Sequence, residues 1–293
     1  MKSLVTLGTF DGVHGGHRRL LRRLVRLARG RRLKSAVVLF STPPRFFFQP
    51  QSVMPLLTLP GERRGILREL GIDRVEVLKF GKAVASLPHE KFFENFILRR
   101  WRAGGLLVGA DFAFGKGRLG DIPWLKSACR GRGIRLWVEP LLQREGLKVS
   151  STRIRAALAE GDVEEAGRLL GRPYFLTGRV VKGQGLGRRF GVPTANLKVE
   201  EGKLLPRGVY KVLVSGPGAL GRSRVGVCNV GTRPTVGGAP RVHVEVHIPG
   251  FTGDLYGKTL RADFLKRLRA ERKFPSLDAL KAQIKKDIAR ALR

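Results

Sequence analysis

A short glycine-rich segment near the start of the chain, residues 8–17, constrains the fold most. It reads Gly-Thr-Phe-Asp-Gly-Val-His-Gly-Gly-His, follows the apolar run Leu4–Leu7 and precedes an amphipathic stretch. A buried strand is therefore expected to turn into a helix at His14 and His17. The start of a helix has unpaired N–H groups and partial positive charge, and glycines let an anion approach the backbone closely. The pattern predicts a phosphate site where a strand meets a helix.

The two histidines, His14 and His17, lie three residues apart and can donate to a phosphate from the same side. Adenylyl transfer requires little else, because the nucleophile is itself a phosphate and the protein has to orient two anions as pyrophosphate leaves. The same residues also occur in solvated loops, and His-x-x-His is half of a metal site to which Asp11 could add an oxygen. No cysteine or third histidine lies nearby in the sequence, which argues against zinc.

Length and composition predict a two-domain cytoplasmic enzyme. The chain has 293 residues, enough for two hydrophobic cores, and 42% of them are hydrophobic. Its two cysteines, Cys129 and Cys228, cannot form a disulfide framework and indicate a reducing compartment. The first apolar run breaks at Gly8, and no later run approaches the roughly 18 residues of a membrane span. We therefore expect neither a secretory signal nor contact with a membrane.

Charge is the extreme property of this composition. The 57 Lys and Arg residues against 23 Asp and Glu give a formal net charge of +34, spread over the whole chain. The predicted first helix has an arginine face opposite a leucine face, an arrangement typical of a solvated helix that also suits anionic ligands. We expect non-specific binding of nucleic acid. A dedicated nucleic-acid-binding protein remains an alternative, and it predicts tight, salt-sensitive binding without turnover.

Short apolar runs alternate with helical patterns through the first part of the chain. Strands are expected at residues 4–7, 36–40, 74–78, 106–108 and 136–138, with helices near 17–29, 61–70, 89–102 and 121–131. This alternation predicts a parallel sheet covered by helices on both faces, with ligands at the carboxyl ends of the strands. The segment 109–115 follows a strand at the same end as the two histidines, so both segments are expected to face one crevice.

A run of hydroxyl residues, Ser150-Ser151-Thr152, precedes a helix that carries Arg155 one turn further on. Ser and Thr are common N-cap residues. Hydroxyls and free N–H groups at a helix start, with an arginine beside them, also bind a triphosphate, so both interpretations hold together. A second helix ends near Leu170, where the pattern changes. The domain boundary is therefore expected between residues 171 and 172.

Beyond Pro173 the chain is rich in short strands separated by glycine and proline. This pattern predicts a small antiparallel β-barrel. Apolar residues recur at helical spacing after residue 276 and predict a terminal helix packed on the barrel. The strands are expected at residues 175–181, 209–214, 224–229 and 241–248.

Thr194 and Asn196 are candidate magnesium ligands in this second part. They lie two residues apart in an extended segment and so present a hydroxyl and an amide oxygen to the same side. Such a pair suits magnesium shared with nucleotide phosphates, and it also fits a simple polar turn. The glycines within residues 182–188 are a weak phosphate-loop signal, because ordinary hairpins contain them too.

In residues 241–248 the valines define one face of a strand, which places His243, Glu245 and His247 together on the other. A carboxylate there could accept a proton from a substrate hydroxyl during phosphoryl transfer. The composition of residues 241–248 alone is typical of an exposed strand face.

The ordered set of these motifs resembles the prokaryotic bifunctional riboflavin kinase/FAD synthetase family from Leu4 to about Ala291. The resemblance implies an α/β nucleotidylyltransferase domain, Rossmann-like with the HxGH motif, at residues 1–171. It implies an antiparallel β-barrel riboflavin kinase domain with a terminal helix at residues 172–293. The matching segments, in order, are 8–17, 108–115 with Arg118 and Asp121, 150–155, 178–196, 206–210, 226–235, Glu245, 255–258 and 268–274.

The resemblance implies two magnesium-dependent steps: ATP phosphorylates riboflavin to FMN, and a second ATP adenylylates FMN to FAD with release of pyrophosphate. Glu245 would activate the ribityl hydroxyl, Thr194 and Asn196 would hold magnesium and ATP, and His14 and His17 would stabilise the phosphates in adenylyl transfer. The other expected substrate-binding and nucleotide-binding residues are Gly8, Phe10, Asp11, Gly12, Asp111, Arg118, Ser150, Ser151, Thr152, Arg155, Gly183, Gly187 and Arg269.

One departure from the family pattern concerns the segment after the second strand. The family usually has Phe-x-Pro-His-Pro there, whereas this chain has Pro43 in place of the histidine, which is expected to bear on adenylylation or on flavin contacts. Another small-molecule adenylyltransferase with the HxGH motif would explain the first domain alone. A class I aminoacyl-tRNA synthetase fits less well, since the second signature is Ser-Ser-Thr-x-x-Arg and no anticodon-binding region is apparent.

Overall fold

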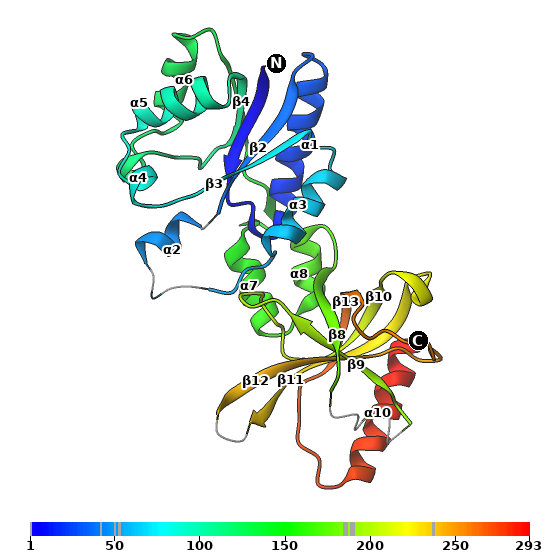
Figure 1. Ribbon diagram of the computed structural model, residues 1–293. Helices are drawn as coiled ribbons and strands as arrows, with labels where there is room; N and C mark the ends of the chain where they lie inside the picture. Colours follow the sequence, from blue (N-terminus) through cyan, green and yellow to red (C-terminus); the bar gives the residue numbers. More distant parts are fainter. Residues whose placement is uncertain are drawn as a thin grey trace. The chain divides into compact units, whose positions relative to one another are not determined.

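The protein forms two compact units, Met1–Ser150 and Ser151–Arg293, whose helices and strands are drawn in Figure 1. Of the glycine-rich segment 182–188, residues 184–186 and 188 lie outside the described part of the chain. The computed structural model describes residues 2–41, 43–49, 51, 54–183, 187, 191–235 and 238–293.

A five-stranded parallel sheet in the order β3-β2-β1-β4-β5 forms the centre of the first unit. Its strands are β1 (Ser3–Gly8), β2 (Lys34–Phe40), β3 (Arg74–Leu78), β4 (Ala103–Gly109) and β5 (Arg135–Glu139). The direction of winding reverses between β1 and β4, and a ligand crevice forms at such a point beyond the carboxyl ends of the strands. The expected parallel sheet is confirmed.

Helices cover both faces of this sheet. Helices α1 (Gly15–Arg29) and α3 (Pro60–Glu69) lie on one face, and α5 (His89–Phe92) and α6 (Ile122–Arg130) lie on the other (Figure 1). The helix expected at 89–102 is α5 continued by a π-helix, η3 (Phe93–Arg100). The shorter elements are η1 (Asp11–Val13), α2 (Pro44–Phe48), α4 (Lys82–Ala85), η4 (Lys116–Arg118) and the hairpin β6 (Gln143–Arg144) and β7 (Leu147–Lys148).

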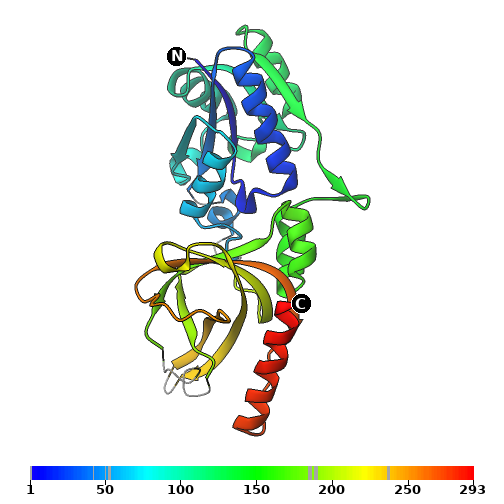
Figure 2. The same ribbon diagram turned by 90° about the vertical axis from the view of Figure 1, so that its right-hand side faces the viewer.

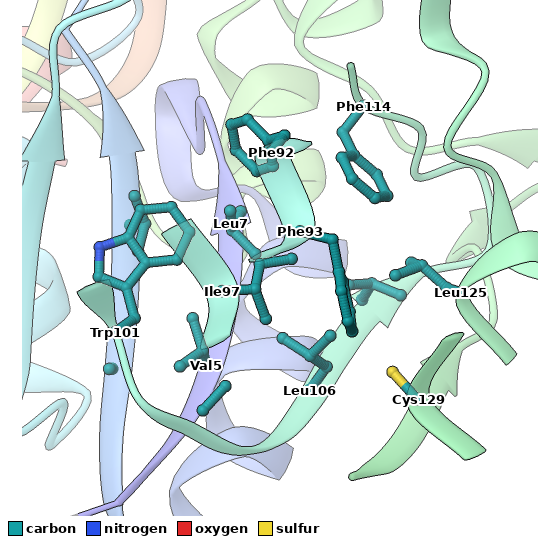
Figure 3. Close-up of a cluster of buried hydrophobic side chains, with 14 of the residues drawn as sticks. Val5, Leu7, Phe92, Phe93, Ile97, Trp101, Leu106, Phe114, Leu125 and Cys129 are labelled. Carbon is teal, nitrogen blue, oxygen red and sulfur yellow. The ribbon is translucent and has the colours of Figure 1, made fainter. Parts of the chain in front are cut away.

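The core on the α5 face is built from aromatic and aliphatic side chains. Figure 3 shows Phe92, Phe93 and Ile97 against the strand residues Leu7 and Leu106. Ile97 and Leu106 are fully buried. Leu4 and Thr6 of β1 are buried as well, so the strand is buried on both faces, as central strands of parallel sheets are.

The second unit is a closed antiparallel barrel flanked by helices. Around the barrel the strands follow the order β10-β11-β12-β9-β8-β13, and Figure 2 shows the terminal helix α10 alongside them. This confirms the expected barrel and terminal helix. The elements are α7 (Ser151–Ala159), α8 (Val163–Leu170), β8 (Tyr174–Val181), β9 (Thr194–Val199), β10 (Gly208–Ser215), η5 (Gly218–Leu220), β11 (Arg224–Thr235), β12 (Gly238–His247), β13 (Thr259–Arg269) and α10 (Leu277–Leu292).

Helices α7 and α8 belong to the second unit by their packing. They pack against each other, and α8 also packs on β8 and β13. The compact units therefore meet at residues 150 and 151, whereas a division of the activities at residues 171 and 172 stays a prediction. Within the described part of the chain, every helix is too short or too polar to cross a membrane.

Candidate active sites

The turn between β1 and α1 holds the two histidines in an unusual backbone conformation. Phe10, Gly12 and Val13 all have positive φ, of 46°, 81° and 43°. A non-glycine residue in this region costs of order 1–3 kcal/mol, and such residues cluster at functional sites. His14 then caps α1, its Nδ1 accepting a hydrogen bond from the His17 N–H at 3.4 Å.

Buried polar contacts with a distant segment stabilise this turn. The Asp11 carboxylate accepts hydrogen bonds from the Leu57 N–H (3.1 Å), the Thr58 N–H (3.0 Å) and the Arg63 guanidinium (3.3 Å). Thr58 Oγ1 accepts from the Gly12 N–H at 2.9 Å, and Arg63 also donates to the Thr9 carbonyl at 2.8 Å. Asp11 therefore holds the turn in place, and its expected binding of nucleotide stays a prediction.

Both histidine rings are neutral near pH 7. The rings stack with centroids 3.6 Å apart, and the edge of Phe10 lies against His17. Burial, with a smaller effect of Lys148, lowers the pKa of His14 to about 4, and burial together with His14 lowers the pKa of His17 well below 6.5. His17 Nδ1 is buried and has no hydrogen-bond partner among the described residues. That atom can therefore pair with a ligand.

The end of β4 brings Asp111 to the same crevice. Its Oδ2 lies 2.5 Å from Lys148 Nζ, and its backbone carbonyl accepts a hydrogen bond from Arg118 at 3.4 Å. The negative charge of Asp111 raises the pKa of His14, against the larger opposite effects of burial and Lys148. The structure thus brings the 8–17 and 109–115 segments together.

An aromatic cavity of about 270 Å³ lies beside this crevice, and Arg118 lines it. Its walls are of the kind that binds a flat aromatic ring. Pro43 directly precedes Pro44, one of the lining residues. The main lining side chains are Leu7, Phe40, Pro44, Phe80, Phe112 and Phe114.

In the barrel, strand register places Glu245 between two asparagines. Glu245 of β12 lies opposite Asn196 of β9 on one side and Asn229 of β11 on the other, and Thr194 lies opposite His247. His247 Nδ1 is 2.8 Å from the Pro193 carbonyl, which fixes that ring. The predicted polar face of β12 thus lies beside polar residues of both neighbouring strands. A cavity of about 380 Å³ between the barrel and α10 is lined by Thr194, Asn196, Asn229, Glu245, Arg269 and Asp287.

Two glycines pack tightly against the Thr194 and Asn196 side chains. A Cβ on Gly183 would lie within 2.5 Å of Asn196 side-chain atoms. A Cβ on Gly187 would meet the Val192 carbonyl, and it would lie 3.1 Å from Thr194 Oγ1. Both positions therefore favour glycine, and Gly183 and Gly187 pack closely around this polar pair, whereas their binding of phosphate stays a prediction.

A buried carboxylate on α10 positions Arg269. Asp287 is 1% exposed, and its Oδ2 accepts a hydrogen bond from Arg269 Nε at 2.9 Å while its Oδ1 accepts from Gln283 at 2.7 Å. The helix thus supplies a charged anchor as well as apolar packing to the cavity.

Residues 1–153 match the family model for FAD synthetase, and residues 170–293 match the model for riboflavin kinase. A bifunctional riboflavin kinase/FMN adenylyltransferase from Pseudomonas fluorescens is 41% identical over 288 residues, 98% of this chain and 91% of its relative. The chain belongs to the bifunctional riboflavin kinase/FMN adenylyltransferase family. The family resemblance seen in the motifs is confirmed.

Other relatives agree over the same length. The bifunctional riboflavin kinase/FMN adenylyltransferase of Escherichia coli K12 is 39% identical over 284 residues, covering 97% of this chain and 90% of its own. A crystal structure described as a macrolide-efflux protein from Streptococcus pneumoniae superposes with a TM-score of 0.90 at 33% identity, covering 100% of this chain and 94% of that one. The whole two-unit chain therefore has structural and sequence counterparts.

In this family member, the Ser150–Arg155 signature spans the junction of the two units. Ser150 ends the first unit, Ser151 begins α7, and Arg155 is buried. The predicted helix start is confirmed. Binding of a triphosphate by Ser150, Ser151, Thr152 and Arg155 stays a prediction.

Several residues that shape the sites lie outside the motifs of the sequence. Arg63 shares the inner face of α3 with Ile66 and Leu67. Asp287 lies at helical spacing from Leu280 and Ile284. In both helices, a charged residue within an apolar helical pattern was the signal that could have indicated a buried polar contact. Glu139, which is buried and accepts hydrogen bonds from two arginines of α1, carried no signal of this kind. Thr58 and Lys148 lie in no motif.

Proposed function

We propose that the first unit adenylylates FMN and the second unit phosphorylates riboflavin, each with ATP as co-substrate. The division is supported by the matches of residues 1–153 to FAD synthetase and 170–293 to riboflavin kinase. One observation carries it: each unit has its own polar site beside its own apolar cavity, of about 270 and 380 Å³. A flavin ring needs the cavity, and its phosphate or ribityl end needs the polar site.

In adenylyl transfer, the FMN ring would occupy the aromatic cavity, with its phosphate directed to the crevice beyond β1 and β4. An FMN phosphate oxygen attacks the α-phosphorus of ATP, the bond to the β-phosphate breaks, and pyrophosphate leaves with the electron pair. His14 and His17 are neutral, so they stabilise the transferring phosphate by hydrogen bonds, and the start of α1 adds its partial positive charge. Asp111 lies close to the FMN phosphate in this arrangement.

The nucleotide would lie with its polyphosphate at the Ser150–Arg155 signature. Hydroxyl groups and unpaired N–H groups at the start of α7 suit phosphate oxygens, and Arg155 adds positive charge. Gly8, Phe10 and Gly12, at the turn between β1 and α1, would contact the nucleotide. Arg118, at the rim of the aromatic cavity, would bind the flavin phosphate.

In the kinase reaction, riboflavin would occupy the cavity between the barrel and α10. Glu245 takes the proton of the terminal ribityl hydroxyl while the hydroxyl oxygen forms a bond to the γ-phosphorus of ATP. The bond from that phosphorus to the bridging oxygen breaks, and ADP leaves. A neighbouring cavity of about 350 Å³ shares Thr194 with this one and is lined by Phe251 and Tyr256. ATP placed there would direct its phosphates to Thr194, and Arg269 would contact the substrates from the other side.

The chemistry of Thr194 and Asn196 fits magnesium. A hydroxyl and an amide oxygen are hard oxygen ligands, and Gly183 and Gly187 hold the two side chains in a close-packed cradle. Magnesium held by Thr194 and Asn196 would neutralise charge on the ATP phosphates during transfer.

FMN made in the second unit is the flavin substrate of the first, so the two steps form one short sequence. We also propose a cytoplasmic location, which is supported by two free and buried cysteines, Cys129 and Cys228. An unrelated adenylyltransferase or an aminoacyl-tRNA synthetase would leave the Glu245 site and its cavity without a role. Non-specific binding of nucleic acid to the basic surface stays a prediction.

The direct test is to incubate the purified protein with riboflavin, ATP and magnesium and to follow flavins by chromatography. The proposal expects FMN first and FAD later. Formation of FMN without FAD, even when FMN is supplied, would contradict adenylylation by the first unit. It would point to Pro43 as the cause, and the Pro43→His variant would test that explanation. No flavin product from a folded protein, together with tight salt-sensitive nucleic-acid binding, would favour the alternative of a nucleic-acid-binding protein.

A further inference from the structure

The hairpin β6–β7 carries Lys148, which lies at the crevice of His14 and His17. Lys148 Nζ lies 2.5 Å from Asp111 Oδ2. The base of the hairpin is closed by the Val149 N–H, which donates to the Leu142 carbonyl at 2.9 Å. Leu142 in turn lies against the first turn of α1, since a Cβ on Gly16 would be 3.5 Å from Leu142 Cβ and 3.3 Å from His14 Cε1. The hairpin is therefore anchored at the helix start that carries the histidines.

The Lys148–Asp111 pair differs from the other ion pairs around this crevice. Both of its side chains are about half exposed, 47% for Lys148 and 55% for Asp111. By contrast, the Asp11–Arg63 pair is buried and shares further hydrogen bonds. Exposed pairs contribute typically about 0–1 kcal/mol to stability, so the fold gains little from this contact. The ammonium can therefore exchange one anion for another.

The charge of Lys148 acts on both catalytic rings. Its positive charge adds to burial in lowering the pKa of His14 and of His17. The hairpin that carries Lys148 is anchored at the helix start that carries the rings, so the ammonium and the rings border the same crevice. Lys148 also stands two residues before Ser150, on the segment to which the polyphosphate of ATP is assigned above.

We propose that Lys148 is a phosphate-binding residue of adenylyl transfer. When ATP binds, the Lys148 ammonium leaves Asp111 and pairs with the polyphosphate. This inference rests on the proposed assignment of adenylyl transfer to the histidine crevice. As the bond between the α-phosphorus and the bridging oxygen breaks, negative charge grows on the pyrophosphate, and the Lys148 ammonium neutralises it without transferring a proton. Before ATP binds, Asp111 keeps the ammonium in position.

The test uses the full chain with FMN, ATP and magnesium supplied. Lys148→Met is expected to lower kcat for FAD formation about 100-fold, the effect of removing one charge-stabilising donor, and to weaken inhibition by pyrophosphate at least about tenfold by the same loss. Riboflavin phosphorylation in the same samples is expected to stay within about twofold of wild type, because the kinase site lies in the other unit. Lys148→Arg should recover most of the activity, and the exposed Lys126→Met variant should behave as wild type.

The outcomes separate the inference from the function on which it rests. Normal kcat and normal pyrophosphate inhibition in Lys148→Met, alongside an inactive His17→Ala variant, would overturn the role of Lys148 alone. Unchanged FAD formation in His17→Ala would overturn the assignment of the crevice. Loss of both activities together with a lowered unfolding temperature in Lys148→Met would show a structural role. If that variant fails to fold, Lys148→Gln provides the same comparison with a polar side chain.

Discussion

The two candidate sites differ in how the fold holds them. The histidine site is a strained turn, stabilised by side chains from a distant segment, Thr58 and Arg63. The Glu245 site lies on neighbouring barrel strands, where backbone register alone sets Glu245 opposite Asn196 and Asn229. The strand site takes its geometry from pairing within the barrel, whereas the turn site depends on Thr58 and Arg63, which lie far from it in the sequence.

The largest effect is expected from a substitution in the Glu245 site alone. Glu245→Ala removes the proposed base, and FMN formation should fall about 1,000-fold, within the usual range for general base catalysis. FAD formation from supplied FMN should continue. Steady-state assays of both reactions on one preparation check this, and a Glu245→Ala variant with normal kinase turnover would exclude Glu245 as the base.

Breaking the turn site should give the opposite result. His17→Ala removes a hydrogen-bond donor to the transferring phosphate, so FAD formation should fall about 100-fold or more, while FMN formation from riboflavin continues. Chromatography of a mixed reaction should show FMN accumulating without FAD. Equal loss of both rates in a folded variant would refute the division of labour between the units.

Arg63→Met sharpens the contrast, because Arg63 contacts no proposed substrate. The change leaves the buried Asp11 carboxylate without its cation, at a cost of about 3 kcal/mol in the free energy of unfolding. Denaturant unfolding should show this loss, and FAD formation should decline with it. The matched variant is Arg179→Met in the barrel, which removes a largely exposed arginine and should change stability by less than about 0.5 kcal/mol.

The smallest expected effect is a flat pH profile. Since burial lowers the pKa of His14 to about 4, kcat/KM for FAD formation should show no histidine inflection near pH 6.5. Stability should behave differently: below pH 6.5 the unfolded chain binds a proton at His14 that the folded chain does not, so stability falls as pH drops from 6.5 towards 4. Thermal unfolding and kinetics across this range test both, and a kinetic inflection near 6.5 would mean that the rings are solvated.

Local patterns predicted most of the framework. The apolar runs of β1 and β4 and the period-3.6 pattern of α1 are readable because each is decided within a few residues. Strand β13 was missed because Arg261, Asp263 and several later cations break up its apolar appearance, although Leu260, Ala262 and Phe264 alternate inward as a strand requires.

Only some residues of the two candidate sites could be predicted from the sequence. His14, Glu245 and Asn196 lie in segments whose spacing is itself the signal. Thr58 and Lys148 act through contacts made across the fold, and sequence separation hides such contacts. The role of Asp11 is also decided at long range, since its partners lie 46 to 52 residues away.

That long-range contact also orders events during synthesis of the protein. The segment containing His14 and His17 leaves the ribosome early, but the Asp11 contacts that fix its turn require Thr58 and Arg63, and the Asp111 side of the crevice requires β4. A growing chain therefore carries the signature of a phosphate site long before it carries the site. The crevice of the histidines is complete only when β4 and the segment that follows it, up to Lys148, have been made.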